Sequence, residues 1–205
     1  MEFKELNHNR HAVKRFKNET VSIDTIRAIL NEAHYAPSGI NMQNWHFVIV
    51  ESAEKKAALA ATGRGHNGEQ ISNAPAVVVI FSDTNLHDRF EKVLQDGGIE
   101  NETQEKWVGR IKNQYLEEVE NYTPQYKSDY LAMNTGFVTM NLMYAIKDAG
   151  YEGNVILGFN KGPHINEILK VDARFRPELV IVFGKSDEKG EPHYRFPLSE
   201  ITEVR

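Results

Sequence analysis

Hydrophobic residues recur at helical spacing in a segment near the start of the chain. Ile23, Ile26 and Ile29 are three residues apart, which places them on one face of a helix. Ser22 precedes this pattern and is a residue type that caps helix N-termini. The sequence Ala36-Pro37-Ser38-Gly39 ends the pattern, because the residue before a proline is disfavoured in the α conformation. We therefore predict a helix that is followed by a loop.

A second, longer helix is predicted over residues 128–149. Apolar residues spread around most of its circumference, among them Leu131, Phe137 and Leu142. A helix that is apolar nearly all round is buried, either in the centre of a domain or in a subunit interface. Gly150 follows the pattern at the position of a left-handed C-terminal cap.

Shorter apolar runs predict strands over residues 45–50, 76–81 and 179–183. The run over 76–81 is rich in valine, as is usual in a sheet that is covered on both faces. Because these strands alternate with helical segments, the pattern alone allows an α+β or an α/β protein. Trp45 at the start of the first strand is expected to be a core residue, and His46 a strand residue without a chemical task.

The remaining segments carry weaker patterns. A helix that Ser52 caps is predicted to reach about Ala61, and the glycines at 63, 65 and 68 indicate a flexible connection. Further helices are predicted over 85–94, 103–119 and 163–169, and an extended stretch or loop over 155–159. The tail over 191–205 has few apolar residues and is a candidate for packing on another chain.

Composition narrows the possible functions. With 205 residues, 40% of them hydrophobic and 26% charged, the chain is expected to form one globular domain over 1–205. It has no cysteine, which excludes disulfides, iron–sulfur clusters and thiolate nucleophiles, so redox chemistry would need a bound cofactor. No signal-peptide pattern or membrane-length apolar run occurs, and the net charge of −5 argues against non-specific nucleic-acid binding. A cytoplasmic protein is expected.

The charge is unevenly distributed along the chain. Between Leu6 and Asn18 there are four cationic side chains and no carboxylate; these are Arg10, Lys14, Arg15 and Lys17. Such a cluster can hold an anion, since arginine and lysine both bind phosphate, or it can serve solubility alone. The acidic stretch over 99–121 is interpreted as the solvated face of a helix.

Common catalytic motifs are absent from the sequence. It contains no P-loop, no G-x-S-x-G and no H-E-x-x-H, and the glycines at 63, 65 and 68 do not follow a predicted strand, as a dinucleotide-binding G-x-G-x-x-G would. His8 and His11 are three residues apart, but Arg10 and Lys14 beside them would repel a divalent cation. We therefore expect no metal site and no nucleophile-based hydrolase.

Several segments together resemble the nitroreductase-like flavoproteins. Arg10-His11-Ala12-Val13-Lys14 with Phe16 is similar to the family's opening motif, and residues 36–47 resemble its A-P-S-x-x-N-x-Q-P-W-x-F segment. Asn67 and Gln70, Leu157-Gly158-Phe159, and Arg195 before Pro197 match later family positions in the same order. Three positions depart from the pattern: Ala12 replaces the usual Ser, Asn44 the usual Pro, and Gln70 the Lys of some relatives.

The resemblance implies an α+β fold with a central, mainly antiparallel sheet flanked by helices. It also implies a long buried interface helix and a C-terminal tail that reaches the partner subunit. The cofactor would be FMN, in two sites shared by the subunits of a homodimer. Chemistry would lie on the FMN, so no catalytic residue of the protein is predicted.

The resemblance also assigns roles to cofactor-binding residues. Arg10, Arg195 and His193 would hold the phosphate, and Lys14 would place a cation near flavin N1, where it favours the reduced form. Asn67 and Gln70 would bind the pyrimidine edge, and the backbone of Leu157 and Gly158 would lie near N5. The remaining positions are His11 and Ala12 in the first motif, and Pro37, Ser38, Gly39 and Asn41, which in relatives come from the partner subunit.

The implied activity is NAD(P)H oxidation coupled to reduction of a nitroaromatic, a quinone or a similar electron-poor acceptor. Donor and acceptor would use the same cleft in turn, which gives ping-pong kinetics. Two alternatives stay open: a flavoenzyme of the same fold with another reaction, such as an enone or dehalogenating reductase, and a non-catalytic FMN-binding protein.

Overall fold

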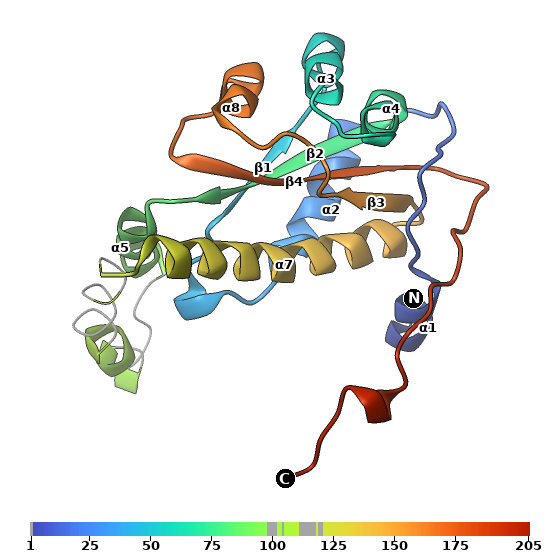
Figure 1. The fold of residues 1–205 in the computed structure, drawn as a ribbon. Helices are drawn as coiled ribbons and strands as arrows, with labels where there is room; N and C mark the ends of the chain where they lie inside the picture. Colours follow the sequence, from blue (N-terminus) through green and yellow to red (C-terminus); the bar gives the residue numbers. More distant parts are fainter. Residues whose placement is uncertain (1, 98–101, 104, 111–117, 119–120) are drawn as a thin grey trace.

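A computed structural model describes residues 2–97, 102, 103, 105–110, 118 and 121–205, and it has a four-stranded sheet at its centre (Figure 1). The strands are β1 (Trp45–Ile49), β2 (Ala76–Asp83), β3 (Glu152–Ile156) and β4 (Phe175–Gly184). Their order is β1-β2-β4-β3, and each neighbouring pair is antiparallel. The structure therefore confirms the α+β prediction with an antiparallel sheet.

Helices cover both faces of this sheet (Figure 1). One face carries α3 (Ala53–Ala60), α4 (Asn67–Asn73) and α8 (Pro163–Leu169), and the other carries α2 (Ile23–Ala33) and α7 (Pro124–Asp148). The other elements with defined bounds are α1 (Phe3–Asn9), α5 (Leu86–Asp96) and two short 3-10 helices, η1 (Gly39–Asn41) and η2 (Leu198–Glu200). No described helix is both long enough and apolar enough to cross a membrane.

The apolar run of β2 is continuous because alternate residues enter different cores. Val78 and Ile80 pack with α2 and α7, whereas Val77, Val79 and Phe81 pack against the opposite helical layer. All five side chains are buried. Since successive strand side chains point to opposite faces, a sheet covered on both sides requires apolar residues at every position.

Two weakly patterned segments can be compared with their predictions. In the stretch expected to be extended or a loop over 155–159, Val155 and Ile156 are the end of strand β3, which begins three residues earlier at Glu152, and residues 157–159 lie outside the strand. The glycine-rich segment is not one flexible connection, because Gly68 lies inside α4. Helix α1 was not predicted. None of its residues is buried, so its sequence lacks the apolar periodicity that indicates a helix. The helix predicted over 103–119 lies partly outside the described residues.

Helix α7 starts four residues before its predicted first residue. The Thr123 side chain accepts a hydrogen bond from the backbone N–H of Tyr126 and caps the helix. Gly150 has a φ of +77°, which confirms the left-handed position after the helix. The helix is buried on one side only within this chain, because Met133, Phe137 and Met140 are exposed.

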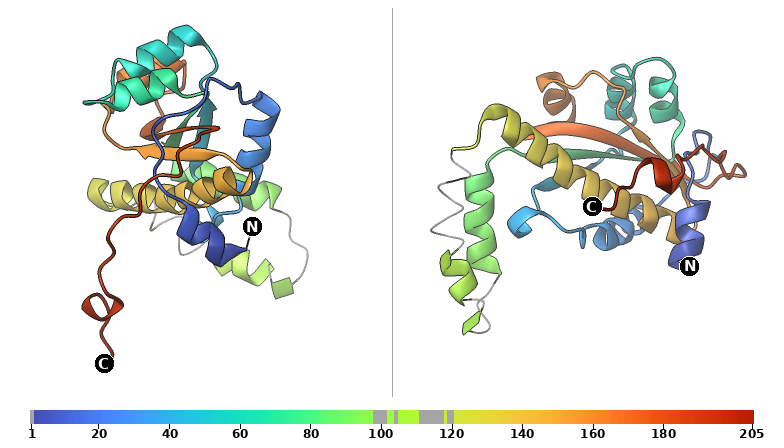
Figure 2. Two further views of the ribbon diagram at one scale, coloured as in Figure 1. Left: turned by 90° about the vertical axis from the view of Figure 1, so that its right-hand side faces the viewer. Right: turned by 60° about the horizontal axis from the view of Figure 1, so that its bottom comes forward.

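The C-terminal tail leaves the body of the protein. Residues 191–205 are exposed throughout, and Figure 2 shows the tail, with η2 near its end, extending away from the sheet and helices. The tail includes two exposed aromatic side chains, Tyr194 and Phe196, which pack edge to face on each other. Aromatic residues in a segment that contacts so little of its own chain are suited to contacts with another.

His46 on β1 makes stability depend on pH. Its ring stacks on Phe175 at a centroid distance of 4.3 Å, and burial, followed by the charge of Arg89, lowers the pKa of His46 below its usual 6.5. The folded state therefore disfavours the proton, so the contribution of His46 is fully present above about pH 6.5 and declines as pH falls towards the lowered pKa.

We expect the His46→Phe variant, which keeps the stacking, to lose less stability than the wild type between about pH 7.5 and about pH 5.5. The measurement is the free energy of unfolding from urea titrations at both pH values. Equal losses in the two proteins would contradict this assignment.

Candidate functional site

The segment over 10–17, called the arm below, lies between strand β3 and the chain that follows β4. Ala12 forms a parallel bridge with Gly153, and the Val13 N–H donates to the Gly153 carbonyl at 3.1 Å. At the other end of the arm, the Lys17 N–H donates to the Lys185 carbonyl at 2.7 Å. These backbone bonds fix the position of the first sequence motif at the edge of the sheet.

The four cations of the arm divide into two pairs. Arg15 binds Glu188 at 2.6 Å and Lys17 binds Asp187 at 2.7 Å, so these two are neutralised by the segment beside them. Within the described chain, the side chains of Arg10 and Lys14 make no ion pair, and Arg10 Nε is buried without a hydrogen-bond partner. A buried, unpartnered guanidinium nitrogen is costly unless a ligand satisfies it, which makes Arg10 a candidate anion-binding residue.

Three side-chain amides form a chain of hydrogen bonds next to the arm. Asn154 Nδ2 donates to Gln70 Oε1 at 2.8 Å, and Gln70 Nε2 donates to Asn67 Oδ1 at 3.3 Å. Asn67 Nδ2 then donates to the Gly158 carbonyl at 2.8 Å. We call this chain the amide relay. Asn154 follows Gly153, which bonds to the arm. The relay therefore connects the arm to Asn67 and Gln70 on α4 and to Gly158 after β3.

The segment at Leu157 and Gly158 closes tightly over α4. The Gly158 carbonyl also accepts a hydrogen bond from the Arg64 N–H at 2.9 Å. A Cβ atom at Gly158 would lie 2.5 Å from Asn67 Nδ2, so a larger residue would displace the Asn67 amide from its place in the relay. Leu157, which precedes Gly158 in the chain, has an exposed apolar side chain.

A second group of predicted site residues lies in the loop that contains η1. The Gly39 N–H donates to Asn134 Oδ1 at 2.9 Å, and the Tyr130 hydroxyl donates to the Gly39 carbonyl at 2.7 Å. Burial raises the pKa of Tyr130 above its usual value, so its hydroxyl keeps the proton that it donates. Both partners of Gly39 are on α7. Pro37 and Asn41 are exposed on the same loop.

This loop is held in a strained conformation. Ile40, Asn41 and Gln43 have φ values of 52°, 55° and 45°, a region that non-glycine residues rarely adopt and that is particularly unfavourable for β-branched isoleucine. Ser38 Oγ accepts from the Gln43 N–H at 2.9 Å, and Arg89 Nη2 donates to the Gln43 carbonyl at 2.7 Å. Strain of this kind costs on the order of 1–3 kcal/mol per residue and is concentrated at functional sites.

The two groups are separated within one chain. The η1 loop is bonded to α7 at Asn134. The arm is bonded to Gly153, which lies next to Ile146 on the same helix, since a Cβ atom at Gly153 would be 3.5 Å from the Ile146 side chain. Twelve residues of helix at 1.5 Å each separate these points by about 18 Å. Figure 1 shows η1 and the arm at different ends of α7. The structure therefore does not bring the predicted residues of the η1 loop together with those of the arm and relay.

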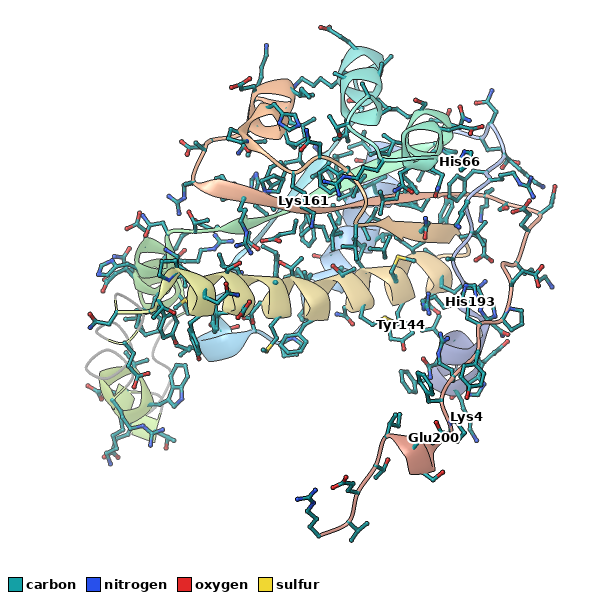
Figure 3. The ribbon with its side chains drawn as sticks, in the orientation of Figure 1. Lys4, His66, Tyr144, Lys161, His193 and Glu200 are labelled. Carbon is teal, nitrogen blue, oxygen red and sulfur yellow. The ribbon has the colours of Figure 1, made fainter. Side chains whose placement is uncertain are left out.

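The predicted residues of the tail are also not joined to the arm. His193 and Arg195 are exposed, and the Arg195 guanidinium donates to the carbonyls of His193 and Tyr194, at 3.3 and 3.0 Å. Figure 3 shows His193 at the end of α7 that carries Tyr144, the end where the arm lies. His11 of the arm contacts Gly190, which precedes the tail: a Cβ atom at Gly190 would lie 2.6 Å from the His11 Cβ.

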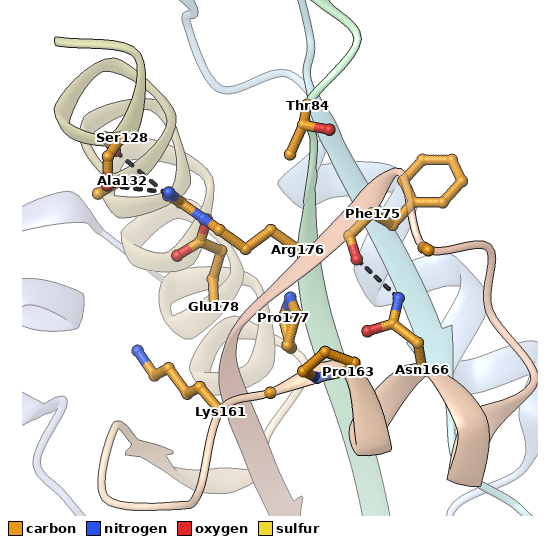
Figure 4. A pocket seen from close by; sticks show the side chains of 12 residues that line it. Thr84, Ser128, Ala132, Lys161, Pro163, Asn166, Phe175, Arg176, Pro177 and Glu178 are labelled. Atoms are coloured by element: carbon orange, nitrogen blue, oxygen red, sulfur yellow. Dashed lines mark hydrogen bonds and ion pairs between the residues drawn. The ribbon is translucent and has the colours of Figure 1, made fainter. Parts of the chain in front are cut away.

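A separate pocket of about 560 Å³ lies between α7, α8 and the start of β4 (Figure 4). Arg176 on its wall binds Glu178 and donates to Ser128 Oγ at 2.9 Å. None of the predicted site residues lines this pocket. Among the described residues, no group of three or more histidine, aspartate or glutamate side chains could hold a metal ion.

Sequence reasoning did not identify Asn154 or Asn134, which hold predicted residues in place. Asn154 and Asn134 are almost fully buried. A polar residue inside an otherwise apolar strand or helix is a usable signal, since buried amides require partners. The identity of those partners depends on tertiary structure and cannot be read from spacing.

Comparison with known proteins identifies the class to which this arrangement belongs. The sequence matches the family model described as the Nitroreductase family over residues 8–185. The chain therefore belongs to the Nitroreductase family.

Individual relatives cover the whole chain. The sequence is 40% identical over 205 residues to the Streptococcus pyogenes protein named "Putative NAD(P)H nitroreductase Spy0809", with 100% of each chain covered. A crystal structure of a nitroreductase family protein from Streptococcus pneumoniae is 44% identical, with a TM-score of 0.90 and complete coverage of both chains. A structure from Exiguobacterium sibiricum, solved in complex with FMN, is 28% identical with a TM-score of 0.85, covering 100% of this chain and 98% of that one.

Proposed function

We propose that this protein is an FMN-dependent NAD(P)H oxidoreductase that reduces nitroaromatics, quinones or similar electron-poor acceptors. The observation that carries the proposal is the pair of unneutralised cations, Arg10 and Lys14, next to the amide relay. A similar structure solved with FMN and a full-length relative named as an NAD(P)H nitroreductase support the choice of cofactor and donor.

The chemistry of the residues fits FMN. Its phosphate needs a cation, and Arg10 has a buried nitrogen without a partner. Its ring needs polar contacts at one edge and apolar contacts on its faces. The half-buried amides of Asn67 and Gln70 would supply the first, and the exposed side chain of Leu157 the second. Arg195 and His193 of the tail are proposed as further phosphate ligands.

FMN would supply the two-electron chemistry by accepting and returning hydride at N5. The protein's residues would hold the reacting atoms in place: the backbone at Gly158 near N5, and Lys14 as a positive charge near N1. Tyr130 and Asn134 would hold the strained η1 loop in position over the ring. No residue of the protein needs to exchange a proton with substrate.

The working unit is proposed to be a homodimer with two shared sites. Each chain carries both halves of the site, but they are about 18 Å apart along α7. A second copy would bring its η1 loop to the arm and relay of the first. The exposed apolar residues Met133, Phe137 and Met140 form a stripe on α7 that such a dimer would bury, and the tail is proposed to reach the partner.

Anaerobic titration of the purified protein tests the function. We expect the protein to bind FMN, and NADH or NADPH to remove the absorption of oxidised flavin near about 450 nm, a general property of that cofactor. Added nitroaromatic or quinone should restore the absorption. A protein that binds FMN without being reduced would be a carrier, and one that binds no FMN would overturn the whole proposal.

A second candidate reaction is supported by one relative. The sequence is 31% identical over 186 residues to the CLA biosynthesis enone reductase of Lactiplantibacillus plantarum, which covers 88% of this chain and 84% of that protein. An α,β-unsaturated ketone as acceptor after the NADH titration distinguishes the candidates. Restored absorption with the enone but not with quinone or nitroaromatic would favour the enone reductase.

Lys14 is predicted to raise the reduction potential of the cofactor. The Lys14→Ala variant should have a lower potential, by on the order of 30 mV, because the anionic reduced form loses a nearby positive charge. Lys17→Ala is the matched control: it removes the same charge from the same arm, at a side chain that Asp187 already neutralises. Equal reduction potentials in the Lys14→Ala variant and the wild type would show that Lys14 does not act on the flavin near N1.

A further inference from the structure

The direction of the amide relay is fixed by the backbone. The Gly158 carbonyl can only accept hydrogen bonds, so Asn67 must point its Nδ2 at it and its Oδ1 the other way. Gln70 must then donate Nε2 to Asn67 Oδ1, and Asn154 must donate Nδ2 to Gln70 Oε1. Every amide orientation in the relay follows from one carbonyl oxygen.

This direction decides which atoms the relay can offer to a ligand. The carbonyl oxygens of Asn67 and Gln70 each accept one hydrogen bond within the relay, and each NH2 group uses one N–H in the relay and retains a second. Asn67 and Gln70 are half-buried, and Asn154 is buried. Each of the two half-buried amides therefore retains an N–H that can donate to a ligand.

We infer that Asn154 is a positioning residue that fixes the Gln70 and Asn67 amides as hydrogen-bond donors towards the carbonyl-bearing pyrimidine edge of the flavin. The inference rests on the proposed FMN site. Asn154 would act only through Gln70, because Gln70 Oε1 is the group to which it donates. With Asn154 in place, Gln70 cannot turn its carbonyl to the cofactor without breaking two hydrogen bonds.

The consequence concerns the reduced cofactor, which carries negative charge at this edge. Fixed N–H donors favour the charged form over the neutral one, so the relay should raise affinity for the reduced cofactor more than for the oxidised. Gln70 is uncharged, but an N–H that is held towards the flavin stabilises negative charge there, as a cation does to a larger extent. Removing Asn154 leaves the Gln70 amide held only by its longer bond of 3.3 Å to Asn67 Oδ1, so its orientation is less strictly fixed.

A double-mutant cycle on the FMN-loaded protein tests the inference. Asn154→Leu is nearly isosteric and adds no charge, Gln70→Leu removes the amide itself, and the third variant combines both. We expect each single variant to bind FMN about 3- to 10-fold more weakly, the effect of one neutral hydrogen bond, and to have a lower reduction potential. The double variant should match Gln70→Leu alone, because Asn154 acts through Gln70.

Asn160→Leu is the matched control, since it makes the same change at an exposed asparagine two residues from Gly158 and outside the relay. Additive losses in the double variant, or an unchanged potential in Asn154→Leu, would overturn the inference. If Asn154→Leu does not fold, an unchanged potential in Gln70→Leu would also overturn it. A wild type that binds no FMN would instead show that the proposed function has failed.

Discussion

Replacing Arg10 by alanine is expected to weaken FMN binding about 10- to 100-fold and to leave riboflavin binding nearly unchanged. A hydrogen bond to a charged group contributes about 1.5–3 kcal/mol, and the Arg10 guanidinium has no competing partner within the described chain. The measurement is the dissociation constant of each flavin from the quenching of its fluorescence. The difference between FMN and riboflavin isolates the phosphate.

Arg15→Ala is the matched control for this experiment. It removes the same charge from the same arm, but Arg15 is already paired with Glu188 at 2.6 Å. We expect little change in FMN affinity from that variant, because an exposed ion pair contributes little. Equal losses for FMN and riboflavin in Arg10→Ala would show that Arg10 supports the fold of the site and does not bind the phosphate.

Placing a charge on the exposed face of α7 is expected to abolish both the dimer and FMN binding. Phe137 is at the centre of the apolar stripe, flanked by Met133 and Met140, and an aspartate there would be buried without a partner in the proposed interface. For Phe137→Asp we expect the sedimentation mass of one chain and a loss of FMN affinity of at least about 100-fold, since each site of the proposed dimer needs two chains.

The control for Phe137→Asp is Ala57→Asp, an exposed helical position on α3 in the opposite layer of the molecule. It should remain dimeric and retain FMN affinity. A monomeric Phe137→Asp protein that still binds FMN tightly would show that one chain forms a complete site. That result would contradict the shared-site account without affecting the family assignment.

The sequence predicted those elements whose stability depends on repeating apolar patterns. β2 was recovered because burial on both faces makes its sequence continuously apolar, and α2 because burial of one face imposes a period of about three and a half residues. β3 was not recovered as a strand from Glu152, because Gly153 and Asn154 interrupt its apolar run. Those two residues bridge the arm and begin the amide relay, so the pattern is broken where the sheet meets the site.

The candidate site residues came from the motif resemblance, whereas the contacts that hold them could not be read from the sequence. The resemblance pointed to Arg10, Gln70 and Gly39, and the structure shows what holds Gln70 and Gly39. Spacing along the chain could not show that Tyr130 and Asn134 hold Gly39 far from the arm, since that separation is set by the length of α7. It also could not show that Arg10, unlike Arg15, makes no ion pair within the described residues.

Mixed dimers test the central claim, that one FMN site is built from two chains. Arg10→Ala damages the arm, and Gly39→Val damages the η1 loop, because a Cβ atom there would collide with the Tyr130 hydroxyl. Each homodimer should bind FMN weakly. A mixed dimer of the two variants, purified with two different tags, would combine an intact arm from one chain with an intact loop from the other.

The measurement is the stoichiometry of tight FMN binding to this mixed dimer. The account predicts a single site of wild-type affinity for each pair of chains, because the second site collects both defects. If each site were formed within one chain, both sites would carry one defect, and no tight site would be restored.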